Sequence, residues 1–121
     1  MQKALYIKKL LKKVLELLND AKSLNIEVID VGNRSSIADF IIITEGNSSR
    51  HVNSIVGRLS KELKNKILSI EGLPRADWAL VDLGDLIIHV FKPEVRQYYN
   101  LEKLWDLGAP EEKQKINKLW N

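Results

Sequence analysis

The chain has 121 residues, of which 45% are hydrophobic and 29% charged, as in one globular domain that buries its own core. It contains no cysteine, which excludes disulfide frameworks, thiolate zinc sites and cysteine nucleophiles. Lysines interrupt the apolar residues near the N-terminus, so we expect neither a signal peptide nor a membrane span, and we expect a cytoplasmic protein.

The net charge of +3 combines two segments of opposite charge. Residues 1–22 contain six lysines and two acidic residues, whereas residues 67–94 contain five acidic residues and two basic ones. Charge of this kind bears on partners and association rates rather than on the fold. The acidic segment therefore favours a basic partner.

The first predicted element is an amphipathic helix from Ala4 to about Leu24, where apolar residues recur at three- and four-residue spacing. Its opposite side carries a group of lysines: Lys8, Lys9, Lys12 and Lys13. Lysine is an ordinary residue at exposed helix positions, so we interpret this side as a solvated face rather than a nucleic-acid or membrane patch.

Two strands are predicted next. Residues 26–31 alternate between apolar and polar side chains, as in a strand that could lie at a sheet edge. Residues 38–44 include the continuous apolar run Phe40 to Ile43, which is typical of a central strand buried on both faces.

A strand, a helix and a further strand then follow one another. Apolar spacing predicts a helix to about Lys64, with Asn47 or Ser48 as its N-cap, and a strand over residues 67–70. This order predicts that the strands before and after the helix lie parallel, joined by a right-handed crossover.

Residues 77–92 are predicted to form a β-hairpin that turns at Gly84 and Asp85, because glycine adopts the positive φ of such turns without cost. The turn fixes the cross-strand pairs: Leu83 with Leu86, Asp82 with Ile87, Val81 with Ile88, Leu80 with His89, and Trp78 with Phe91. The register therefore sorts the side chains of the hairpin into two faces.

The two faces differ in chemistry. One is wholly apolar: Ala79, Val81, Leu83, Leu86, Ile88 and Val90. The other adds rings, a carboxylate and an imidazole: Trp78, Leu80, Asp82, Ile87, His89 and Phe91. We expect helices of the chain to cover the first face, since exposed apolar area costs roughly 25 cal/mol per Å². We expect the second face to stay exposed and to bind a partner through its aromatic residues.

After the hairpin, Pro93 is suited to the first turn of a short helix that extends to Trp105. We therefore assign residues 1–121 to a single domain. Its parts are an N-terminal helix (1–24), a mixed-sheet core (25–105) and a C-terminal tail (106–121).

The loop EGNSSRH, residues 45–51, combines hydroxyl and basic side chains before a helix, so it could hold an anion or cap the helix. Capping is favoured, since neither a P-loop nor a dinucleotide-binding glycine pattern is present. Anion binding here would make the chain a nucleotide-binding or nucleotidyltransferase-like enzyme, which is the alternative function.

Metal and acid–base sites are poorly supported. His51 and His89 are the only imidazoles, and the carboxylate pairs lack the further ligands of a metal centre. Asp82 and His89 share a hairpin face, and we interpret them as a polar pair at an interface rather than as catalytic groups. We therefore expect no catalytic residues, metal or cofactor.

Several segments between about Leu5 and Trp105 carry a family resemblance, in order and at matching spacing: Asp30-Val31, Ser35-Ser36-Ile37-Ala38-Asp39, Asn47-Ser48-Ser49-Arg50-His51-Val52, Glu71-Gly72, Ala76-Asp77-Trp78, Val81-Asp82-Leu83-Gly84-Asp85, Val90, and Arg96 to Trp105. In these segments the chain resembles the ribosomal silencing factor S family, also called Iojap-like proteins. Glu45 departs from the threonine or serine that is usual there.

The resemblance implies an α/β (α+β) fold: a mixed β-sheet of about five strands with flanking helices, similar to a minimal nucleotidyltransferase without its catalytic aspartates. It also implies a translation factor that is not an enzyme. Such a factor binds the large ribosomal subunit through the fourteenth large-subunit ribosomal protein and blocks subunit joining. We expect little or no sequence-specific nucleic-acid binding and no membrane partner, and the predicted edge strand or the long first helix could support a homodimer.

The resemblance further implies the residues of the partner surface. They come from the hairpin and the helix after it: Trp78, Asp82, Gly84, Asp85, His89, Arg96, Tyr99 and Glu102. The remaining side chains of the aromatic hairpin face complete the predicted surface: Leu80, Ile87 and Phe91.

Overall fold

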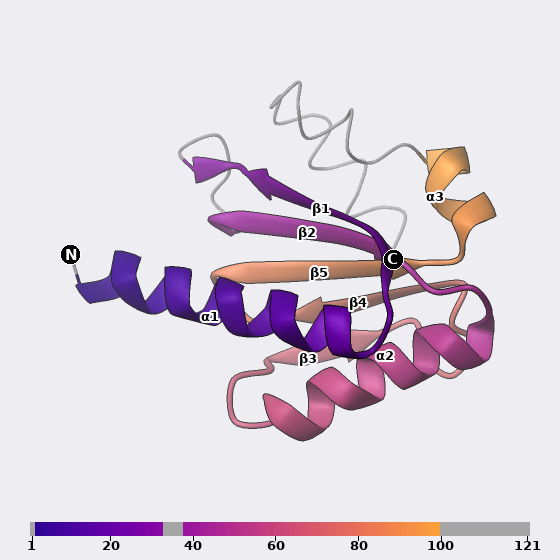
Figure 1. Cartoon of the computed structure of the whole chain (residues 1–121), viewed down its shortest axis with the longest axis horizontal. Coiled ribbons are helices and arrows are strands. Elements are labelled where there is room, and N and C mark those ends of the chain that lie inside the picture. The colour runs from indigo at the N-terminus through magenta and orange to yellow at the C-terminus, as the bar shows by residue number, and fades with distance from the viewer. Residues whose placement is uncertain (1, 33–37, 100–121) are drawn as a thin grey trace.

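The computed structural model describes residues 2–32 and 38–99 (Figure 1). Its elements, in chain order, are α1 (Gln2–Asp20), β1 (Leu24–Asp30), β2 (Phe40–Glu45), α2 (Ser49–Glu62), β3 (Ser69–Glu71), β4 (Trp78–Asp82), β5 (Leu86–Phe91) and α3 (Pro93–Tyr99). The predicted class, a mixed sheet with flanking helices, is confirmed. The tail over 106–121, the helix beyond Tyr99 and the residue Glu102 lie outside the described residues.

The strands form one five-stranded sheet in the order β1-β2-β5-β4-β3, in which only β2 and β5 are parallel neighbours (Figure 1). β2 and β3 point the same way, as the strand-helix-strand order predicts, but β5 and β4 lie between them. The middle strand is β5 rather than the predicted 38–44 segment. β2 is nevertheless an interior strand and is buried on both faces, as predicted.

The hairpin of β4 and β5 has the predicted register, from Trp78 opposite Phe91 to Asp82 opposite Ile87. Gly84 has a φ of +86°, a left-handed conformation that glycine adopts readily. The Gly84 N–H donates to the Asp82 carboxylate at 2.8 Å, so the aspartate closes its own turn.

Both long helices lie on the same face of the sheet (Figure 1). Their apolar sides form one buried cluster with Ile42 and the predicted apolar face of the hairpin, as the periodicity indicated. α1 ends at Asp20, earlier than Leu24, and Lys22 just beyond it has a φ of +61°.

The other face of the sheet is also buried, and the prediction that it is exposed is wrong. Trp78 is 8% exposed and His89 2%, and Ile87 and Phe91 are buried beside them. Trp78 and Phe91 belong to a second apolar cluster with residues of β1 and β2, and Val95 of α3 packs against this cluster. Alternation shows which side chains share a face, but tertiary packing decides what covers it.

Candidate partner-binding surface

The predicted aromatic patch is an internal cluster. The Trp78 Nε1–H donates to His89 Nδ1 at 2.9 Å, and the Trp78 and Phe91 ring centroids lie 4.8 Å apart. An indole nitrogen can only donate, so His89 accepts at Nδ1 as a neutral imidazole. Burial lowers the pKa of His89 to about 3, which keeps the ring neutral at physiological pH. These side chains therefore support a surface rather than form one.

The predicted pairing of Asp82 with His89 is wrong. His89 bonds to Trp78, whereas the Asp82 carboxylate accepts the Gly84 N–H at the turn. The two residues share a face as diagonal neighbours, because the predicted register, with Leu80 opposite His89, is the one observed. The sequence places Trp78 on the same face but does not show which polar group its indole meets.

The accessible part of this face lies along β4 and the turn that follows it. Leu80, Asp82, Gly84 and Asp85 are half-buried. On the neighbouring strand, Glu71 is exposed and pairs with Leu80, so the two share this face. We call these five residues the acidic rim.

Apolar surface adjoins the acidic rim. Leu68 is 72% exposed and lies beside the turn, since its Cδ1 would be 3.5 Å from a Cβ added at Gly84. An exposed leucine next to carboxylates resembles the arrangement of protein interfaces, in which an apolar centre is surrounded by a polar rim.

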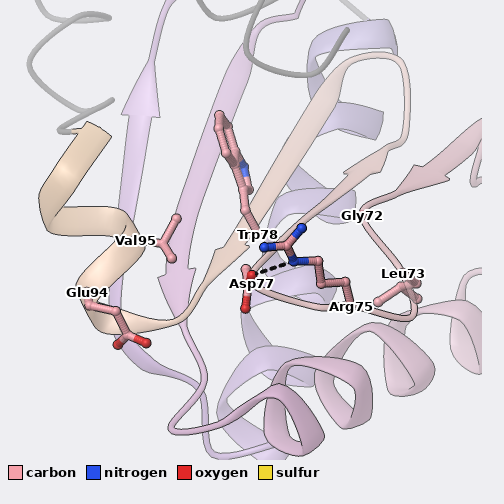
Figure 2. A pocket seen from close by; sticks show the side chains of 7 residues that line it. All are labelled: Gly72, Leu73, Arg75, Asp77, Trp78, Glu94 and Val95. Atoms are coloured by element: carbon pink, nitrogen blue, oxygen red, sulfur yellow. Dashed lines mark hydrogen bonds and ion pairs between the residues drawn. The ribbon is translucent and has the colours of Figure 1, made fainter.

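A cleft of about 670 Å³ opens at the other end of the hairpin (Figure 2). Glu94 and Val95 of α3 line one side, Gly72, Leu73 and Arg75 of the β3–β4 loop line the other, and Asp77 and Trp78 lie between them. The Asn53 side chain of α2 donates to the Pro74 carbonyl at 3.3 Å and so fixes the loop. Trp78, although buried, is thus one of the residues that line this cleft.

Asp77, which lines this cleft, pairs with two basic side chains. Asp77 accepts hydrogen bonds from Lys92 Nζ and from Arg75 Nε, each at 2.9 Å. These bonds lower the pKa of Asp77, and the bond from Lys92 has the larger effect. The bond to the Asp77 carboxylate in turn raises the pKa of Lys92. Both groups are half-buried at the surface, where solvent screens their charges, so the pairs orient the cleft wall more than they stabilise the fold.

Arg96 lies in an internal ion pair, which the resemblance did not show. Its guanidinium lies 3.0 Å from Glu45 Oε2, and the two side chains are 10% and 11% exposed. Arg96 also donates to the Asn25 carbonyl, and the Asn25 amide donates to Glu45 at 3.2 Å. Glu45, the departure from the usual threonine or serine, is therefore the residue that ties α3 to β1 and β2.

The 45–51 loop is a capped helix start, as favoured from the sequence. Ser48 is the N-cap and accepts the His51 N–H at 3.1 Å. His51 Nδ1 accepts the Asn47 N–H, and its Nε2 lies 2.9 Å from the Ala21 carbonyl of the α1–β1 connection. A Cβ at Gly46 would approach the Val52 nitrogen to 2.9 Å, so helix and loop pack too closely for a side chain there.

Two further observations concern the described residues alone. Among residues 2–32 and 38–99, no group of three or more His, Asp or Glu side chains is arranged to hold a metal ion. Within the same ranges, no helix has the length and apolar character needed to cross a membrane. Tyr99 is the last residue of α3.

The described part of the chain thus defines a small α/β protein with an acidic rim, a charged cleft and polar side chains that mostly cap and pack. The family described as "Ribosomal silencing factor during starvation", RsfS, matches residues 5–120. The chain belongs to this family, whose members are regulatory proteins rather than enzymes. The match continues past Trp105, where the resemblance found from motifs ended.

Individual relatives agree with this assignment. A protein named ribosomal silencing factor RsfS from Zymomonas mobilis is 47% identical over 102 residues, which cover 82% of this chain and 77% of the relative. One of the same name from Halalkalibacterium halodurans is 39% identical, with 79% and 85% covered. A crystal structure of a Chromobacterium violaceum protein superposes with a TM-score of 0.79 at 34% identity, covering 83% of this chain and 86% of that one.

Proposed function

We propose that the chain binds the large ribosomal subunit at its inter-subunit face, through the fourteenth large-subunit ribosomal protein, and sterically prevents the small subunit from joining. Family membership supports a ribosomal partner. The observation that carries the docking site is the acidic rim, because a basic ribosomal protein complements its charge. This role represses translation without a cofactor or a chemical step.

The proposed contact residues are those that the fold leaves accessible. Asp82, Asp85 and Glu71 supply negative charge, and Leu80 with the exposed Leu68 supplies apolar area. Charge complementarity speeds encounter and sets orientation, whereas buried apolar contact supplies affinity. A basic partner can meet both requirements at the acidic rim.

The other predicted site residues receive supporting roles in this proposal. The buried aromatic cluster holds β4 and β5 in place behind the acidic rim: Trp78, Ile87, His89 and Phe91. Arg96 fixes the position of α3 through Glu45. Tyr99 and Glu102 stay in the proposed surface on the family resemblance alone.

A charge change at the acidic rim tests this proposal. We expect Glu71→Lys with Asp82→Asn to weaken binding to purified large subunits at least tenfold in co-sedimentation, a loss of about 1.4 kcal/mol. Asp82→Asn keeps an oxygen for the Gly84 N–H, so the turn stays intact. Glu62→Lys with Asp20→Asn makes the same two kinds of charge change at exposed positions on the helices and is the matched control. Equal affinities for the two variants would overturn the proposed docking site.

Self-association belongs to the same proposal. β1 is an edge strand, and Leu24 and Val28 on it are exposed, so a second copy could pair there. Sedimentation equilibrium of the chain and of Val28→Lys would show whether a dimer forms through this edge.

We also place the protein in the cytoplasm, where bacterial relatives such as those above would meet their ribosomes.

A further inference from the structure

Lysines from two separate elements meet at a small cleft on the helix side of the molecule. The cleft holds about 210 Å³ and is lined by Tyr6, Lys9, Leu10, Lys13, Leu63 and Lys66. Lys66 comes from the turn after α2, which the Lys66 N–H closes by donating to the Leu63 carbonyl at 2.8 Å. The sequence alone indicated a solvated lysine face on α1, and it did not place Lys66 there.

An aromatic ring and an apolar floor accompany these charges. Tyr6 is 44% exposed, and Lys66 Nζ lies 4.8 Å from the centroid of its ring. Leu10 and Leu63 below them are buried. A cation over an aromatic face is attracted by the ring, so Tyr6 and Lys66 position each other at the surface.

Ion pairs among the described residues do not include the lysines of this cleft. In the described ranges, Lys9, Lys13 and Lys66 form no ion pair, whereas Lys3 reaches Asp85 and Arg58 reaches Asp20. Positive charge therefore accumulates at the cleft without an ion-pair partner from residues 2–32 or 38–99.

Helix stability does not account for the charge pattern of α1. Lys9 and Lys13 are four residues apart, a like-charge spacing that destabilises a helix. The first turn of α1 contains no acidic residue and its last turn no basic one, although the helix dipole favours both. Glu16 lies four residues after Lys12, and an ion pair at this spacing is more favourable when the glutamate comes before the lysine. An external anionic partner explains this arrangement better.

We propose that Lys9, Lys13, Lys66 and Tyr6 bind the phosphate backbone of RNA on the large subunit, without reading its sequence. This inference rests on the proposed function, which brings the chain to an RNA-rich particle. Ammonium groups bind phosphate as point charges, and an exposed ring can stack on a sugar or base.

The position of the cleft suits a second contact on the same particle. Lys3 at the start of α1 lies 3.7 Å from Asp85 of the acidic rim, so the helix that carries Lys9 and Lys13 begins beside the acidic rim. A basic protein bound at the acidic rim would therefore hold neighbouring RNA close to α1.

An anionic membrane fits this surface less well. A helix that lies in a membrane interface buries its apolar side in lipid. The apolar side of α1 packs instead against α2 and the sheet, where Leu10, Val14 and Leu18 are buried. The lysines thus remain available for polar contacts while the apolar side of the helix is already occupied.

The salt dependence of binding tests the inference. Each phosphate contact adds about 0.7 to 0.9 to the slope of log affinity against log salt, so Lys9→Gln with Lys66→Gln should lower the slope by about 1.5. Lys22→Gln with Arg50→Gln removes the same charge from exposed positions elsewhere and should leave the slope unchanged. A fourfold rise in salt should then weaken the control about eightfold more than the test variant.

Binding to a short RNA duplex of mixed sequence separates the outcomes. We expect salt-sensitive binding by the wild-type chain and the control variant, and weaker binding by the test variant. Equal salt slopes for the two variants on large subunits would overturn the inference, as would binding to phosphatidylserine vesicles or to an acidic peptide in place of the duplex. Failure of the wild-type chain to bind large subunits would instead overturn the proposed function, and the duplex would then decide the inference alone.

Discussion

The two faces of the sheet are both buried, but they are built differently. On one face, α1 and α2 cover an aliphatic layer with long apolar stripes. On the other, Trp78 and Phe91 pack with residues of β1, β2 and α3, and a buried imidazole is joined to the indole by a hydrogen bond. The first kind of core follows from local periodicity, whereas the second depends on contacts between distant segments.

Truncation of one side chain on each face compares the two cores directly. We expect Phe91→Ala to lower the free energy of unfolding by about 3–5 kcal/mol and Leu86→Ala by about 2–5 kcal/mol, because both side chains are fully buried. Urea unfolding of the two variants measures both values. A loss below about 1 kcal/mol for Phe91→Ala would mean that its face is no core.

The ion pair between Arg96 and Glu45 should be next in effect. Arg96→Met leaves the Glu45 carboxylate nearly buried without its cation, at a cost of about 3 kcal/mol. The double variant with Glu45→Gln should cost less than the sum of the single variants, since the stranded charge is then gone. Strict additivity in urea unfolding would show that the two groups do not interact.

His89 should make stability fall as the solution becomes more acidic. Its pKa is lowered from 6.5 in the unfolded chain to about 3 in the fold, so below pH 6.5 only the unfolded chain takes up its proton. The contribution of neutral His89 to the free energy of unfolding is then fully present above pH 6.5, and it falls by about 1.4 kcal/mol per pH unit toward pH 3. His89→Gln, which keeps a polar side chain but does not titrate, should have a smaller slope between pH 6 and pH 5. Equal slopes would place His89 in water.

The smallest expected effect tests the hydrogen bond from the Gly84 N–H to the Asp82 carboxylate. Asp82→Ala should cost about 1 kcal/mol, because the Gly84 N–H loses its acceptor, whereas Asp82→Asn should stay within about 0.5 kcal/mol of the wild type. Thermal unfolding at pH 7 is sufficient to see the difference. A larger loss for Asp82→Asn than for Asp82→Ala would mean that the negative charge, not the turn bond, matters.

Local signals predicted much of the fold. Gly84 with the alternation around it predicted the hairpin register. The polar run before α2 predicted an N-cap at Asn47 or Ser48, and Ser48 is the N-cap in the structure. The separation of Arg96 from Glu45 is 51 residues, and no periodic pattern links charges that far apart. The burial of Trp78 escaped prediction for the same reason, because its cluster includes residues of β1, β2 and β5, and Val95 of α3 packs against it.

The candidate site was predicted only in part. The acidic character of the hairpin was visible in the sequence, and the residues of the acidic rim remain accessible in the structure. The aromatic residues were predicted to be the contact itself, yet the fold uses them as support. Whether a side chain near an interface touches the partner or holds the surface in place depends on packing, which the alternation of a strand does not encode.

Fluorescence of Trp78 alone tests most directly whether the second face is a core with the acidic rim as its accessible edge. The variant Trp105→Phe with Trp120→Phe carries Trp78 as its only tryptophan. We predict emission at short wavelength and acrylamide quenching several-fold slower than that of a free tryptophan amide. Emission and quenching like those of the free amide would contradict the account, because Trp78 would then lie in solvent on an open aromatic face.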